Sequence, residues 1–127
     1  MADDQGENQG AKSFRAFFQN TSHRLLIGVS GFFWVLSFGV IWYSIGNREA
    51  TIVLHYNVYF GIDILGGWWQ AYFIPFSGIG IWIVHIFLAF SFFQSARRIL
   101  CQIALSSLLF LEGMVLVASL AIGLINY

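Results

Sequence analysis

A chain of 127 residues is long enough for one domain at most. Charged residues make up 9 % of it, against roughly 25 % in soluble domains. Hydrophobic residues make up 58 %, and a soluble fold could not bury so many Phe, Trp, Ile and Leu side chains. The net charge is zero, so no basic surface indicates a nucleic-acid partner, and the single cysteine, Cys101, excludes an internal disulfide.

The N-terminal part of the chain is polar over residues 1–10, with three acidic residues and two glycines, and we predict a disordered tail there. Residues 11–127 are expected to form one transmembrane domain. At its start, Phe14, Phe17 and Phe18 recur at i, i+3 and i+4 beside basic residues. That spacing is typical of a short amphipathic helix on the inner leaflet, although a simple extension of the first membrane helix is the alternative.

Three apolar stretches follow, at residues 25–45, 72–93 and 99–125. Each is long enough to cross a bilayer as a helix, which takes about 20 residues. The first is too long for a signal-peptide core and lacks an A-x-A-like site, so we expect it to be retained. The predicted fold class is therefore an all-α membrane protein with three transmembrane helices and a structured outer loop at residues 46–70.

Small residues and one proline predict how these helices pack. Ser30, Ser37 and Ser44 recur every seven residues in the first span, and the third span carries Ser119 and Gly123. Small side chains on one stripe let helix backbones approach closely, within the bundle or between copies. Pro75 predicts a kink if the second helix begins near Trp68, or a comfortable first-turn position if the helix begins near Pro75 itself.

The basic residues predict how the chain is oriented. Five of the six lie before the first span or between the second and third, and only Arg48 lies between the first and second. Short loops rich in Lys and Arg stay cytoplasmic, so we expect a multi-pass protein of the cytoplasmic membrane with its N-terminus inside and its C-terminus outside. The topology-setting residues are Lys12, Arg15, Arg24, Arg97 and Arg98. The aromatic belt expected at the outer interface comprises Trp42, Tyr43, Trp68, Trp69 and Tyr72.

The outer loop holds the densest cluster of unusual residues. Residues 51–56 are rich in β-branched and apolar side chains and suit an extended strand. Residues 54–75 resemble a bacterial membrane domain of unknown function, which also precedes the immunity domain that protects cells against sporulation-delaying toxin. The resemblance rests on the loop residues His55, Tyr56, Asn57, Gly61, Asp63 and Gly66, followed by Pro75. Val53 and Leu65 stand where that family has Pro and Trp. The family has no established activity, so the resemblance implies an architecture and not a reaction.

Two interpretations of His55, Asn57 and Asp63 are open. In the first, their polar side chains bond the backbone of an irregular loop. In the second, they contact a ligand or a metal outside the membrane, together with Glu49. A metal site needs several such groups at suitable spacing, so we favour the first and predict no metal and no cofactor.

Two titratable residues lie deep in apolar sequence, His85 in the second span and Glu112 in the third. They stand 13 and 14 residues from Arg98 on either side, which predicts similar depths in an antiparallel helix pair. We expect this intramembrane polar pair to be a structural clasp, with a proton- or cation-handling site as the alternative. His23, at the inner membrane edge, is expected to be solvated.

No nucleophile–base set and no phosphate-binding loop stands out, so we predict that the protein is not an enzyme. The first functional hypothesis is a subunit or accessory factor that binds other membrane proteins, or copies of itself, within the lipid bilayer. The alternatives are a small proton or cation transport component that uses His85 and Glu112, and an immunity or sensing protein that binds a peptide at the outer loop.

Overall fold

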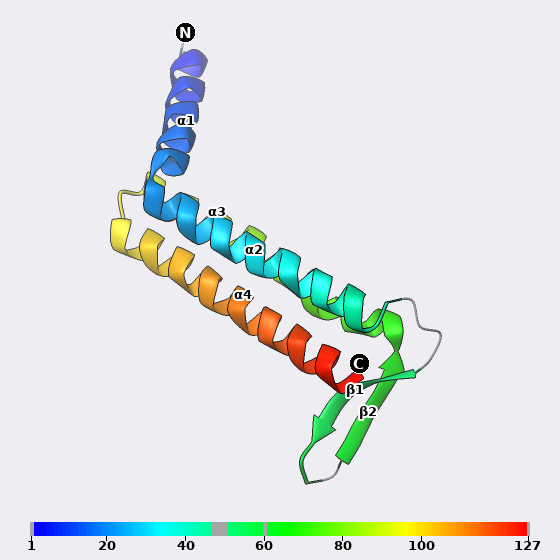
Figure 1. Ribbon diagram of the computed structural model, residues 1–127. Coiled ribbons are helices and arrows are strands. Elements are labelled where there is room, and N and C mark those ends of the chain that lie inside the picture. The colour runs from blue at the N-terminus through cyan, green and yellow to red at the C-terminus, as the bar shows by residue number, and fades with distance from the viewer. Residues whose placement is uncertain (1, 47–50, 60, 127) are drawn as a thin grey trace.

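The computed structural model describes residues 2–46, 51–59 and 61–126. In the described part of the chain, three long helices lie side by side in a bundle, a helix extends crosswise from one end, and a two-stranded hairpin extends crosswise from the other (Figure 1). The N- and C-termini lie at opposite ends of the bundle. In chain order, the elements are α1 (Ala2–Gln19), α2 (Thr21–Ser44), β1 (Thr51–Asn57), β2 (Gly61–Gly67), the 3₁₀ helix η1 (Trp68–Tyr72), α3 (Phe73–Gln94) and α4 (Arg98–Asn126).

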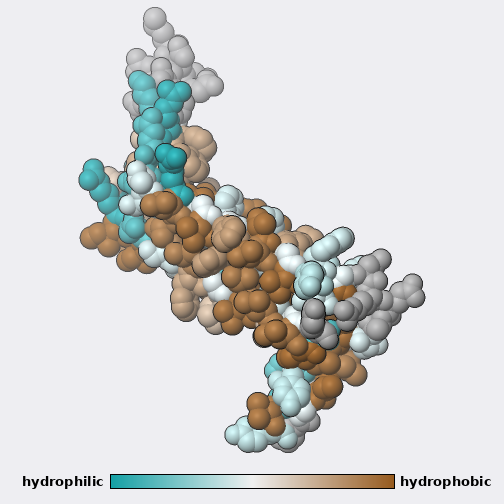
Figure 2. Space-filling model, in the orientation of Figure 1, coloured by the Kyte–Doolittle hydropathy of each residue, from teal (hydrophilic) through white to brown (hydrophobic). Residues whose placement is uncertain are grey.

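The three predicted membrane spans are confirmed as helices long and apolar enough to cross a bilayer. They are α2, the continuous segment Trp68–Gln94 and α4. Large apolar side chains cover much of the bundle face that the space-filling view shows (Figure 2). The exposed ones include Phe32, Phe87, Phe110 and Leu124. Such a surface suits lipid as the surrounding solvent, because soluble monomers rarely expose apolar patches of this extent.

Helix α4 is the central element of the bundle, packed along both α2 and α3, which touch each other little. Its buried face carries Leu105, Leu108, Glu112, Val115, Ser119 and Ile122. The serine stripe predicted in α2 faces the interior, since Ser30, Ser37 and Ser44 are all buried. A Cβ atom on Gly123 would lie 2.8 Å from Ser44 Oγ, so the missing side chain of this glycine allows α2 and α4 to approach closely.

The outer loop adds a small sheet, so the expectation of an all-α fold is incomplete. Strands β1 and β2 pair antiparallel from Thr51 opposite Gly67 to Asn57 opposite Gly61, with irregular register around His55. Thr51–Asn57 is rich in β-branched side chains, as expected for a strand. Gly61 adopts φ +77°, a backbone conformation that favours glycine.

Pro75 lies in the first turn of α3, which begins at Phe73. The preceding residues, Trp68–Tyr72, form the separate 3₁₀ turn η1. The structure therefore has the first-turn position rather than the kinked helix. In the first turn, proline costs no main-chain hydrogen bond.

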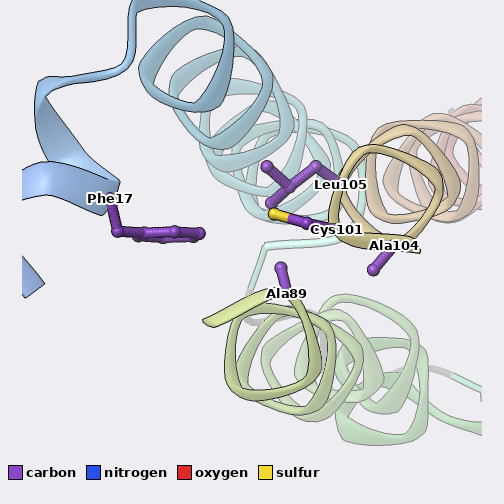
Figure 3. Close-up of a cluster of buried hydrophobic side chains, with 5 residues drawn as sticks. All are labelled: Phe17, Ala89, Cys101, Ala104 and Leu105. Carbon is purple, nitrogen blue, oxygen red and sulfur yellow. The ribbon is translucent and has the colours of Figure 1, made fainter. Parts of the chain in front are cut away.

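Helix α1 includes Ala2–Gly10, the stretch for which composition predicted disorder. Near the other end of α1, Phe17 is fully buried against Ala89 of α3 and Cys101 and Leu105 of α4 (Figure 3). Phe17 therefore docks the helix onto the bundle.

Candidate functional site

Glu112 lies near the middle of α4 and is 0 % exposed. Neither of its carboxyl oxygens has a hydrogen-bond partner among the residues that the structure describes. Removing an isolated carboxylate charge from water is very unfavourable. The group is therefore either neutral or partnered by something other than this chain, and both states are unusual for a purely structural residue.

The Glu112 carboxyl lies where all three long helices meet. A Cβ atom on Gly78 of α3 would lie 3.0 Å from Glu112 Oε2 and 2.9 Å from Trp34 Cδ1 of α2. Only a glycine at position 78 leaves room for both groups. The Trp34 indole N–H donates to the Pro75 carbonyl oxygen at 2.9 Å, which fixes the ring beside the carboxyl.

The structure does not bring His85 and Glu112 together. His85 lies seven residues beyond Gly78, about 10 Å further along α3. Its Nδ1 lies 2.8 Å from the Ile81 carbonyl oxygen and bonds the preceding turn of its own helix. The predicted equal depth is wrong because the α3–α4 turn centres on Ala96, not on Arg98. Counting from Ala96, the residue level with Glu112 is Gly80.

Within the outer-loop motif, Asn57 serves the backbone, as the first interpretation expects. Its Oδ1 accepts a hydrogen bond from the Tyr59 N–H at 2.9 Å and so closes the hairpin turn. A side chain on Gly66 would collide with Leu54 and Gln70. His55 and Tyr56 are exposed on the hairpin.

The second interpretation of the loop, in which its polar residues bind a metal, requires several ligating side chains close together. Glu49 and the side chain of Asp63 lie outside the described part of the chain. Across the residues that the structure describes, no three His, Cys, Asp or Glu side chains group so that they could hold a metal ion.

A second contact at the hairpin was not predicted from the sequence. The side-chain amide of Asn126, in the last turn of α4, pairs with the backbone of Val53 in β1. Asn126 Oδ1 accepts from the Val53 N–H and its Nδ2 donates to the Val53 carbonyl oxygen, both at 2.7 Å. The Asn126 amide thus makes the same pair of hydrogen bonds to β1 that a residue of a neighbouring strand would make. The signal available in the sequence was a lone amide at the end of an apolar span.

His23 is 5 % exposed, so the prediction that it is solvated is wrong. Its Nδ1 lies 3.1 Å from the Phe17 carbonyl oxygen, and its Nε2 lies 3.7 Å from Cys101 Sγ. The docked end of α1 covers the His23 ring. The sequence of α2 alone does not predict where α1 docks, so it could not predict that His23 is buried.

The described basic residues and the Trp- and Tyr-lined groove lie at opposite ends of the bundle. Figure 2 shows hydrophilic residues over α1 and the adjoining bundle end. The basic side chains there are all exposed: Lys12, Arg15, Arg24, Arg97 and Arg98. Arg48 lies outside the described residues. At the hairpin end, a groove of about 590 Å³ is lined by Trp42, Gly46, Trp68, Trp69, Tyr72, Phe73 and Phe76. Tyr43 is exposed at the same end of α2.

Comparisons with protein-family models, curated proteins and solved structures find no match. The resemblance of the outer loop to the bacterial membrane domain therefore stays a prediction.

Proposed function

We propose that this chain is a non-catalytic subunit or accessory factor of a bacterial cytoplasmic membrane, which binds other membrane proteins through its hairpin and helix faces. The hairpin carries this proposal. Its base is anchored by buried Ile52 and by the Asn126–Val53 pair. Its far half exposes Tyr56, Val58, Tyr59, Ile62 and Ile64, and Leu65 nearer the base is exposed as well.

Exposed apolar side chains on a two-stranded hairpin favour a binding role. Val58 and Tyr59 at the tip are 84 % and 90 % exposed. A two-stranded hairpin is marginally stable by itself, and a third strand or a packed surface normally stabilises it. A partner that covers the hairpin would supply that surface, either by packing on the side chains or by pairing with the free edge of β2.

The proposed orientation places α1 and the basic end in the cytoplasm and the hairpin outside. The clustering of five exposed basic residues at the α1 end supports it. Helix α1 would then lie along the inner leaflet, with Lys12 and Arg15 near the headgroups and exposed Phe14 toward the acyl chains.

The test is site-specific photo-crosslinking in cells, with a photoreactive residue at Val58 or, as a matched control, at lipid-facing Phe87 of α3. We expect a discrete protein adduct from position 58 and none from position 87. The double variant Ile62→Ser, Ile64→Ser, with a photoreactive residue at Val58, should lose the adduct while still inserting. Adducts to lipid alone from position 58 would contradict the proposal.

A second candidate function, proton or cation handling, is favoured by the buried carboxyl of Glu112, which has no hydrogen-bond partner among the described residues. Intramembrane carboxyls of this kind mark ion or substrate pathways in many membrane proteins. In proteoliposomes, a proton or cation flux that Glu112→Gln abolishes and His85→Gln leaves intact would support it. Equal flux from empty and protein-loaded vesicles would rule it out.

A further inference from the structure

A groove of about 480 Å³ runs between α2 and α3. It is lined by Gly31, Trp34, Val35, Ile79, Trp82 and Ile83. The two tryptophans pack reciprocally, each against a glycine of the other helix. Trp34 lies against Gly78, and the indole nitrogen of Trp82 is 3.8 Å from the Cβ position of Gly31. Two indole rings therefore form the polarisable part of an otherwise aliphatic groove.

The Trp34 ring connects this groove to the buried carboxyl. Its Cδ1 and Glu112 Oε2 both lie about 3 Å from the same point beside Gly78. The indole thus lines the groove and also lies next to Glu112. One hydrogen bond, from Trp34 Nε1–H to the Pro75 carbonyl, holds the ring in this position. Glu112 itself does not line the groove, so we infer that a rotation of Trp34 that breaks this bond is the step that would open the carboxyl to a molecule bound there.

We propose that the groove between α2 and α3 binds a lipophilic organic cation whose charge is neutralised by the Glu112 carboxylate. This inference rests on the second candidate function and specifies the class of cation. Charge complementarity favours this class of ligand, because a buried carboxylate without a hydrogen-bond partner in the described chain attracts positive charge and the faces of Trp rings stabilise organic cations. The volume falls within the range of small-molecule pockets.

An inorganic ion fits this place less well than an organic one. Hard cations need several oxygen ligands, and the described part of the chain holds no group of three or more His, Cys, Asp or Glu side chains that could bind a metal ion. The nearest buried hydroxyl on the same face of α4, that of Ser119, lies two helical turns away. A delocalised organic cation needs one counter-charge and an apolar, aromatic surround, and both are present here.

The test is equilibrium binding of tetraphenylphosphonium to the purified full-length chain in detergent, with tetraphenylborate as an anion of the same size and shape. We expect saturable binding of the cation and only micelle partitioning of the anion. Glu112→Gln should weaken cation binding by about tenfold or more, because it removes the counter-charge but keeps the side-chain volume. Glu112→Asp should retain part of the affinity, and Ser119→Ala should leave it unchanged.

Trp34→Phe gives a second, independent readout. It keeps an aromatic ring but removes the hydrogen bond to Pro75, so the cation should associate faster than with the wild-type chain. Equal binding of cation and anion, or wild-type affinity in Glu112→Gln, would overturn the inference and indicate a simple lipid groove. Glu112-dependent proton flux without cation binding would overturn it while leaving the second candidate function standing. If neither cation binding nor Glu112-dependent flux is observed, both this inference and the second candidate function are overturned.

Discussion

Ala96 is the one described non-glycine residue with a positive φ, at +56°. It follows the C-cap of α3, where the Ala96 and Arg97 N–H groups donate to the Phe93 and Phe92 carbonyl oxygens at 3.1 and 2.9 Å. These two bonds make the Schellman motif that ends many helices, usually with glycine in this place. The turn therefore sets the register of α3 against α4 with a strained residue at its centre.

Ala96→Gly should stabilise the protein by about 1 kcal/mol, because glycine adopts the left-handed conformation without the steric cost that alanine has. The measurement is the thermal unfolding midpoint by circular dichroism in one detergent. Ser95→Gly is the matched control, since Ser95 has φ −80° and gains nothing from glycine. A lower midpoint for Ala96→Gly than for the wild type would contradict this account of the turn.

A substitution at Gly123 tests how closely α2 and α4 pack. A Cβ there would lie 2.8 Å from Ser44 Oγ and 3.1 Å from Val40 Cγ1. Gly123→Ala should therefore destabilise the bundle by about 1–3 kcal/mol through overpacking. Gly39→Ala, in α2, has open space around it and should be neutral or slightly stabilising. Chemical denaturation of both variants in mixed micelles would compare them, and equal stabilities would refute the close approach.

At the scale of elements, the hairpin depends on a contact from the far end of the chain. Asn126→Ala removes both hydrogen bonds to Val53 and should free β1 from α4, at a local cost of about 1–3 kcal/mol. Hydrogen exchange of the peptide covering β1 should speed up by roughly tenfold or more. Leu124→Ala, which alters an exposed neighbour in the same turn, should leave that exchange unchanged. Unaltered exchange in Asn126→Ala would mean that the strand is held by other contacts.

The elements that sequence predicted well are those dictated by local composition. The three spans follow from runs of apolar residues, and the strand at Thr51–Asn57 follows from β-branched content. The inward stripe of Ser30, Ser37 and Ser44 follows from a period close to two helical turns.

The features that sequence missed depend on long-range contacts or on turn geometry. The depth of Glu112 relative to α3 depends on the turn at Ala96. Burial of His23 depends on α1 folding back through Phe17. The Asn126–Val53 pair joins residues 73 positions apart.

At the scale of the whole molecule, α4 organises everything else. It packs along α2 and α3, places Glu112 between them, and anchors the hairpin through its last turn. The basic residues gather at one end of this bundle and the aromatic groove and hairpin at the other. An odd number of long helices places the two termini at opposite ends. We propose that these two ends lie on opposite sides of a membrane.

Cysteine accessibility in intact cells tests this claim most directly. Single cysteines at Gly10, Val58 and Ser95, all exposed positions, would be introduced into a Cys101→Ala background. A membrane-impermeant maleimide should label the cysteine at position 58 from outside. It should label those at positions 10 and 95 only after the membrane is permeabilised. Labelling of positions 10 and 58 from the same side of an intact membrane would contradict the account.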